Sequence, residues 1–340
     1  MDEKLKNIQN RLRAGKLGGV ILFSPSNIDY MTGFRTDGGA VLLTRNDLLL
    51  AAGPLDYSAA LHSAKCRVEK SLSLEKFLKK HRGIGAIGAA REISFDRYKT
   101  LHSVFGKKIV FLDDVLFGAR AVKTACEIKK IRAACRLAKK TMDFAVKTAR
   151  PGMAECALAS EIECFMRKAG SDGESFATIV ASGPNTAFPH HIPSERKFGR
   201  NDIVYADLGC SYRLYNSDLT NTFFLGKINK YGLKIRDIVK EAHRLALNAV
   251  RPGVPCKDVD SAARNFIAEN GLEDYFIHST GHGVGLDIHE APAISRKSSA
   301  VLEENMVITV EPGIYIPGRF GVRIEDTVLV TKKGCEVLTK

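Results

Sequence analysis

Apolar and polar positions in the first 120 residues alternate between the period of a strand and the period of a helix. The predicted strands are 17–24, 40–53, which contains a turn at Arg45–Asp47, and 107–116, and the predicted helices are 74–81 and 94–106. The glycines among them form neither a G-x-G-x-x-G fingerprint nor a Walker loop. We therefore expect a small α/β domain without a nucleotide-binding motif.

A long amphipathic helix follows this domain. Thr124, with Glu127 three residues later, is typical of a capping box that opens a helix. Apolar residues then recur at spacings of three and four, at Ile128, Ile131, Cys135, Ala138, Met142 and Ala145. Because proline cannot continue a helix, we expect this one to end at 150–152. The pattern predicts an N-terminal domain at 1–122 and a second domain at 123–340.

The second domain contains an internal repeat. RPGMAECALASEIECFMRKAG (150–170) aligns without a gap with RPGVPCKDVDSAARNFIAENG (251–271). Both segments begin with Arg-Pro-Gly and end in glycine. Further along, DIVYADLG (202–209) matches NMVITVEPG (305–313) in its strand pattern. The repeat predicts an α/β unit that has been duplicated about a pseudo-twofold axis.

Acidic residues recur at matching positions of the two copies. Asp207 lies opposite Glu311, and SDLTNTFFLG matches IEDTVLVTKKG so that Asp218 lies opposite Glu325. A pseudo-twofold axis would bring these four carboxylates together in the core. Buried charges must be paired or bind a metal, so we expect divalent cations there.

One histidine completes this candidate ligand set. His282 lies between Gly281 and Gly283, where the backbone can approach closely and the imidazole stays accessible. Four carboxylates and one imidazole favour a two-metal hydrolytic centre for Mn²⁺, Co²⁺ or similar ions rather than a closed cysteine–zinc site.

Four further residues are candidates for the same pocket. His190 follows the first copy of the repeat much as His289 follows the second, so the two are available to polarise a carbonyl or to transfer protons. His278 lies four residues before His282. Arg323 lies two residues before Glu325, where it could hold that carboxylate or contact a substrate.

Composition narrows the class of protein. The 340 residues are 45% hydrophobic and 26% charged, as in soluble globular proteins of two domains, and no apolar run is long enough for a membrane span. The eight cysteines form no C-x-x-C pair, which favours reduced and mostly buried thiols in a cytoplasmic protein. The net charge of +13 is concentrated in residues 1–150, but without an arginine-rich tract, so we expect a solvated basic surface and no nucleic acid partner.

The motifs ASGPNTAFPHH, DLGCSYRLYNSDLTNTFF, HSTGHGVGLDIHE, VEPGIYIPG and GVRIEDTVLVT together resemble those of the pita-bread metallopeptidases, specifically the Xaa-Pro peptidases. The resemblance covers roughly 124–340, and residues 1–120 resemble the N-terminal domain of that group. It implies an α+β protein in which a smaller α/β domain precedes a pita-bread catalytic domain. It also implies a homodimer.

The resemblance implies roles for the candidate residues. Asp207, Asp218, His282, Glu311 and Glu325 would bind two ions, with Asp218 and Glu325 bridging them. His190 and His289 would be catalytic together with Glu311, and His278 and Arg323 would line the substrate pocket. One position departs from the family, which commonly has Thr-Arg-Thr where this chain has Thr220, Asn221 and Thr222. Asn221 cannot make the salt links of an arginine, so local packing is expected to differ.

The implied activity is hydrolysis of the bond before proline, in Xaa-Pro dipeptides (prolidase) or in longer peptides with proline at the second position (aminopeptidase P). The sequence leaves this choice open, with a slight preference for the dipeptidase because the chain is compact. A methionine aminopeptidase normally lacks the N-terminal domain, and a creatinase-like hydrolase lacks the full ligand set. A non-enzymatic binding protein of the same fold is the remaining alternative.

Overall fold

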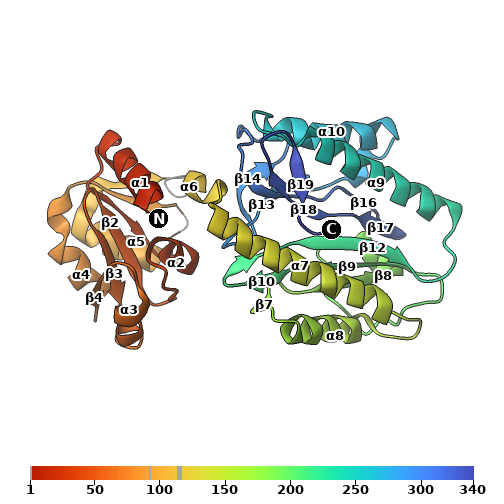
Figure 1. Ribbon diagram of the computed structural model, residues 1–340, viewed down its shortest axis with the longest axis horizontal. Coiled ribbons are helices and arrows are strands. Elements are labelled where there is room, and N and C mark those ends of the chain that lie inside the picture. The colour runs from red at the N-terminus through yellow and green to blue at the C-terminus, as the bar shows by residue number, and fades with distance from the viewer. Residues whose placement is uncertain (1, 92, 113–116) are drawn as a thin grey trace. The chain divides into compact units, whose positions relative to one another are not determined.

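The computed structural model describes residues 2–91, 93–112 and 117–340, and it divides into two compact units, Met1–Ala119 and Arg120–Lys340 (Figure 1). The helices of the first unit are α1 (Asp2–Ala14), α2 (Pro25–Thr32), α3 (Tyr57–Ser63), α4 (Leu74–Lys80) and α5 (Phe95–Phe105), and α6 (Phe117–Ala121) follows them. Its strands are β1 (Gly19–Leu22), β2 (Ala40–Thr44), β3 (Leu48–Ala52), β4 (Arg67–Lys70), β5 (Ile87–Ala90) and β6 (Ile109–Leu112). The predicted strands and helices are present, except that 113–116 of the last strand lie outside the described residues.

The first unit is a three-layer α/β domain. Its mixed sheet has the order β4-β3-β2-β1-β5-β6. Successive residues of β1 face opposite sides, so Val20 packs in the core with α1, α2 and α3, whereas Ile21 packs in the core with α4 and α5. The continuous apolar runs seen in the sequence are therefore strands that are covered on both faces.

The second unit begins with helix α7 (Ala125–Thr148), which is opened by the predicted capping box at Thr124 and Glu127. The other helices are α8 (Glu155–Lys168), α9 (Lys230–Ala249) and α10 (Cys256–Glu269). The strands of the first half are β7 (Gly173–Glu174), β8 (Ile179–Ser182), β9 (Ile203–Leu208), β10 (Cys210–Tyr212), β11 (Tyr215–Asn216) and β12 (Leu219–Phe224). The strands of the second half are β13 (Gly281–Gly283), β14 (Glu290–Ile294), β15 (Val307–Val310), β16 (Gly313–Ile316), β17 (Phe320–Arg323), β18 (Asp326–Val330) and β19 (Cys335–Val337).

The structure confirms the internal repeat. Helices α8 and α10 each have 14 residues, and both begin and end at positions that the ungapped sequence alignment makes equivalent. Gly152 and Gly253, which precede them, both have positive φ, at 86° and 83°. Their amides donate to Phe198 O and Leu302 O, each at 2.8 Å. Equivalent sequence thus adopts the same turn and the same helix.

The two halves stack their strands between two layers of helices. Helices α7 and α8 pack on β8, β9 and β12 in one core, and α9 and α10 pack on β15 to β18 in another (Figure 1). The inner faces of the strands therefore meet in the middle of the unit. This is the arrangement that the duplicated α/β unit predicted.

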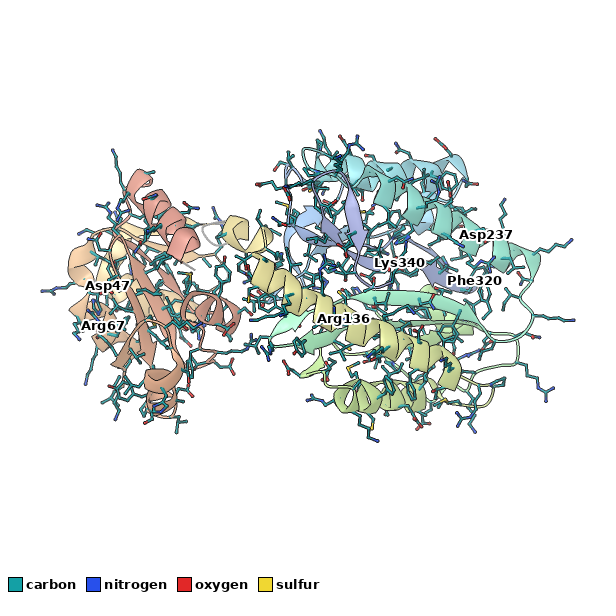
Figure 2. The ribbon with its side chains drawn as sticks, in the orientation of Figure 1. Asp47, Arg67, Arg136, Asp237, Phe320 and Lys340 are labelled. Carbon is teal, nitrogen blue, oxygen red and sulfur yellow. The ribbon has the colours of Figure 1, made fainter. Side chains whose placement is uncertain are left out.

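The surface of the first unit is charged. Asp47 and Arg67 form an ion pair of 3.2 Å there, and both side chains are largely exposed (Figure 2).

All eight cysteines are free, but only Cys135, Cys210 and Cys256 are buried, so the prediction that most thiols are buried is wrong. No helix within the described part of the chain has the length and apolarity that a membrane span requires.

Candidate metal centre

The first half of the repeat supplies two acids on one face of a strand pair. β9 and β12 are antiparallel, and Asp207 pairs with Thr220. Asp218 lies two residues before Thr220, so its side chain points to the same side. β10 and β11 form the polar turn between the two strands. The two strands therefore form a hairpin, with a small second ladder inserted in it.

The second half supplies the other three residues. His282 is the middle residue of β13, Glu311 directly follows β15, and Glu325 lies between β17 and β18. The strand register departs from the match made in the sequence. Thr220 and Thr327 are equivalent in the repeat, and Thr220 pairs with Asp207 whereas Thr327 pairs with Thr309. The strand pairing therefore makes Thr309, not Glu311, the equivalent of Asp207. Glu311 lies two residues further along, and its carboxylate accepts a hydrogen bond of 3.2 Å from Thr309.

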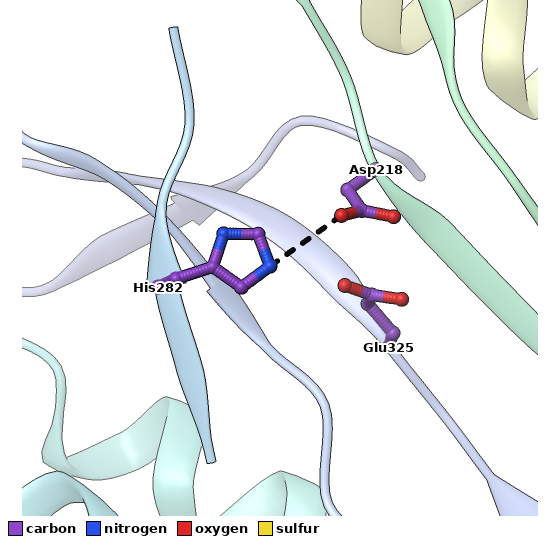
Figure 3. Close-up of side chains that lie close together, drawn as sticks. All are labelled: Asp218, His282 and Glu325. Atoms are coloured by element: carbon purple, nitrogen blue, oxygen red, sulfur yellow. Dashed lines mark ion pairs between the residues drawn. The ribbon is translucent and has the colours of Figure 1, made fainter. Parts of the chain in front are cut away.

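These side chains converge in the middle of the unit. Ligand atoms of Asp218, His282 and Glu325 all lie within 4.8 Å of one another. Figure 3 shows the three side chains pointing toward one another from separate segments of the chain. Nε2 of His282 lies 3.6 Å from Asp218 Oδ2 and 3.3 Å from Glu311 Oε1. Asp207 lies in the sheet of β8, β9 and β12, whereas His282 lies in the sheet that contains β13 and β15, so the site forms only in the folded chain.

Burial and mutual repulsion change the protonation of the carboxylates. Burial raises the pKa of Asp218 well above its ordinary value, and the negative charges of Asp207 and Glu311 raise it further. Burial and the charges of Asp218 and Glu311 likewise raise the pKa of Glu325. The pKa of Glu311 is also raised, mainly by burial. In the absence of a bound cation, these three carboxylates therefore favour their protonated forms, and a cation would displace the protons.

The polar groups at the centre fit divalent cations. Asp207 Oδ1 and Glu325 Oε1 are buried, and neither has a hydrogen-bond partner within the described ranges. Buried carboxylate oxygens are seldom left without a partner. Burial lowers the pKa of His282 and so favours the neutral imidazole that binds metals. The donor set, rich in oxygen, suits hard or borderline divalent ions.

Arg323 holds a carboxylate different from the one that sequence spacing suggested. β17 ends at Arg323. The guanidinium of Arg323 forms an ion pair with Asp207 rather than with Glu325. The connection to Glu325 runs through Thr220, which receives a hydrogen bond of 3.1 Å from Arg323 and donates one of 2.6 Å to Glu325. Arg323 also donates to the hydroxyl of Tyr315.

The three remaining histidines lie around this centre. The ring of His289 contacts the ring of His282 at a centroid distance of 4.2 Å. Burial lowers the pKa of His289, and positive charge on His282 or His190 lowers it further. Nε2 of His278 lies 3.0 Å from the hydroxyl of Tyr315. The structure therefore brings all nine predicted site residues into one region of the second unit.

Sequence reasoning missed the hydroxyl groups that support the site. Thr220 and Thr327 matched in the repeat, but no role was assigned to them. Tyr315 and Thr309 were not singled out at all, although their hydroxyls contact Arg323 and Glu311. The alternation of Thr309 and Glu311 on one strand face was the signal available for Thr309.

Two family models match the chain. Residues 129–332 match metallopeptidase family M24, and residues 4–122 match the creatinase/prolidase N-terminal domain. A curated protein named Xaa-Pro dipeptidase, from Pyrococcus horikoshii, is 39% identical over 342 residues, which are 100% of this chain and 97% of that protein.

Solved structures agree with these matches. The structure titled as the prolidase from P. horikoshii has a TM-score of 0.96 at 38% identity, and the match covers 99% of this chain and 98% of that one. The structure titled as an X-Pro aminopeptidase from Thermotoga maritima has a TM-score of 0.87 at 34% identity, over 98% of this chain and 97% of that one. The predicted pita-bread fold is confirmed, and the chain belongs to metallopeptidase family M24.

Proposed function

We propose that the chain is an Xaa-Pro dipeptidase that uses two divalent metal ions. The observation that carries this proposal is the convergence of Asp218, His282, Glu311 and Glu325, to which Arg323 and Thr220 link Asp207. This site lies in a chain that matches an Xaa-Pro dipeptidase over its full length. A binding protein derived from the same fold would not need to keep a buried, mutually repelling acid cluster, which is costly to fold.

Asp207, Asp218, His282, Glu311 and Glu325 would hold the ions. Mn²⁺ and Co²⁺ suit a set of four carboxylates and one imidazole. Such ions, when bound, activate a water molecule and polarise a carbonyl group.

The side chains around the ligands would handle the substrate and its protons. Glu311 would also accept a proton from the attacking water and pass it to the leaving nitrogen. His190 and His289 would donate hydrogen bonds to the carbonyl oxygen or to the proline nitrogen of the scissile bond. His278 would line the pocket, and the contacts of Arg323 favour a role in holding Asp207.

A chelator should abolish hydrolysis of an Xaa-Pro dipeptide, and Mn²⁺ or Co²⁺ should restore it. The same assay addresses the runner-up, an Xaa-Pro aminopeptidase, which the similarity to the T. maritima structure supports. Comparison of the dipeptide with an Xaa-Pro-containing tripeptide separates the two, since a dipeptidase should leave the tripeptide intact. Full activity in metal-free protein would contradict the proposal.

Two further properties belong to this proposal. We expect a homodimer, which sedimentation velocity would test. We also expect a cytoplasmic protein, since its eight free cysteines suit a reducing compartment. Cell fractionation would test that location.

A further inference from the structure

Glu155, the first residue of α8, is a buried carboxylate that lies outside the metal centre. Its side chain has an exposed fraction of 0%. Oε1 accepts hydrogen bonds from the amide of Ser182 at 2.8 Å and from its hydroxyl at 2.6 Å. Oε2 accepts hydrogen bonds from the amide of Ser194 at 3.1 Å and from its hydroxyl at 2.7 Å. Asn185 donates to both oxygens, at 3.1 and 3.2 Å.

One more contact links this carboxylate to the residue that follows His190. Nε2 of His191 lies 2.7 Å from Glu155 Oε2, and His191 directly follows His190. Burial alone would raise the pKa of Glu155, but the hydrogen bonds from Ser182, Ser194 and His191 outweigh it and lower the pKa. Glu155 is therefore ionised at neutral pH, and its charge favours the His191 tautomer that donates from Nε2.

His190 is thus held between two fixed neighbours. On its other side, the carbonyl of Pro189 accepts hydrogen bonds of 3.4 Å from Arg323 and from Tyr205. His190 itself is exposed, and its side chain has no hydrogen bond to any described residue. The position of its imidazole therefore depends on the backbone, which Arg323 and Tyr205 fix before it and Glu155 fixes after it.

The second half of the repeat uses a related arrangement. Asp260 on α10, which is also fully buried, accepts hydrogen bonds from the amide and the hydroxyl of Thr280, at 3.2 and 2.8 Å. Its partner Arg264 donates to the carbonyls of Phe276 and His278, at 2.9 and 2.7 Å. In both halves, a buried acid on the equivalent helix fixes a loop that carries a histidine of the site.

We propose that Glu155 is a positioning residue that acts through His190. It holds the 182–194 loop so that His190 faces the substrate over the metal centre. This inference rests on the proposed function, because it requires His190 to act on an Xaa-Pro substrate. It assigns to Glu155 no contact with substrate or metal.

A double-mutant cycle tests the proposal. Glu155→Gln keeps the size of the side chain but removes the charge, and it replaces one acceptor oxygen with a donor. We expect kcat on an Xaa-Pro dipeptide to fall by roughly 10- to 100-fold, the scale of a small misplacement of a catalytic group. In a His190→Ala background, the same substitution should lower kcat by less than about twofold, because residues that act together are not additive.

Glu127→Gln is the matched control. Glu127 is also a buried acid in the first turn of a helix, and it accepts hydrogen bonds from Thr124 and Tyr215, both of which lie outside the 182–194 loop. This control should keep kcat within about twofold. Metal content per chain should equal that of the wild type in Glu155→Gln and in the control.

Hydrogen–deuterium exchange supplies a readout that does not depend on activity. Amides of the 182–194 loop should exchange faster in Glu155→Gln, with or without metal, whereas those of 276–283 should not change. If Glu155→Gln does not fold, Ser194→Ala removes a single hydroxyl donor, and its effect on kcat should likewise disappear in the His190→Ala background.

The outcomes are distinct. A wild-type enzyme that hydrolyses the dipeptide, with additive effects of the two substitutions, would overturn the role of Glu155 and leave the proposed function intact. A wild-type protein with full metal content and no hydrolysis of any Xaa-Pro peptide would overturn both.

Discussion

Asp218 is buried near Asp207, Glu311 and Glu325, and burial and these like charges raise its pKa. If it bridges both ions, Asp218→Ala removes a ligand from each, whereas His282→Ala removes a ligand from one. Metal content per chain should therefore fall further in Asp218→Ala than in His282→Ala, with activity lost or severely reduced in both. Elemental analysis of the two purified variants measures this. Equal or greater retention of metal in Asp218→Ala would show that this aspartate is not the bridge.

His190 and His289 lie at the margin of the same centre, and both are exposed. His190→Ala and His289→Ala should each lower turnover by roughly 10²- to 10⁴-fold, the usual range for a positioned acid–base group, with metal content near normal. Steady-state kinetics and elemental analysis on the same samples check the two parts. Loss of metal from either variant would place that histidine among the ligands instead.

At the residue scale, the sequence predicted which side chains form the site better than it predicted their hydrogen-bond partners. The five candidate ligands could be identified because the repeat aligned acids with acids and because glycines flank His282. The hydrogen-bond partners could not, since Arg323 contacts Asp207 across 116 positions of sequence. Spacing along one strand suggested Glu325 instead, but the strand ends at Arg323.

Among the elements, α7 shows how far local sequence decides structure. Its capping box, its apolar face and its end before Pro151 were all predicted, because caps and periodicity are local properties. The β10–β11 ladder and the register of Thr309 were not predicted, because strand pairing depends on segments distant in sequence.

The capping box of α7 supplies a test at this scale. Thr124 accepts a hydrogen bond from the amide of Glu127, and the Glu127 carboxylate accepts one from the amide of Thr124. Thr124→Ala should therefore lower the free energy of unfolding by about 1 kcal/mol. Equilibrium urea unfolding measures the change. Thr148→Ala, at the other end of the helix, should stay within about 0.5 kcal/mol of the wild type. Equal effects of the two substitutions would mean that the cap does not stabilise the helix.

On the scale of the whole molecule, the acid cluster makes folding depend on metal and on pH together. In the metal-free protein, the pKa values of Asp218, Glu311 and Glu325 are raised by burial and by mutual repulsion. Unfolded Asp and Glu side chains titrate near pH 4. Between that pH and the raised folded values, the native state binds more protons than the unfolded state, so its stability falls as pH rises.

Bound divalent ions reverse this trend, because they supply the positive charge that protons otherwise provide and they stabilise only the folded chain. The thermal midpoint of the metal-loaded protein should therefore exceed that of the metal-free protein by a margin that is smallest near pH 5 and grows toward pH 8. Thermal unfolding with and without excess Mn²⁺ at each pH measures the margin. His243, whose pKa burial lowers to about 4, makes both forms less stable as pH falls below about 6.5, and it cancels in the difference. A margin independent of pH would show that the carboxylates are already ionised in the metal-free chain.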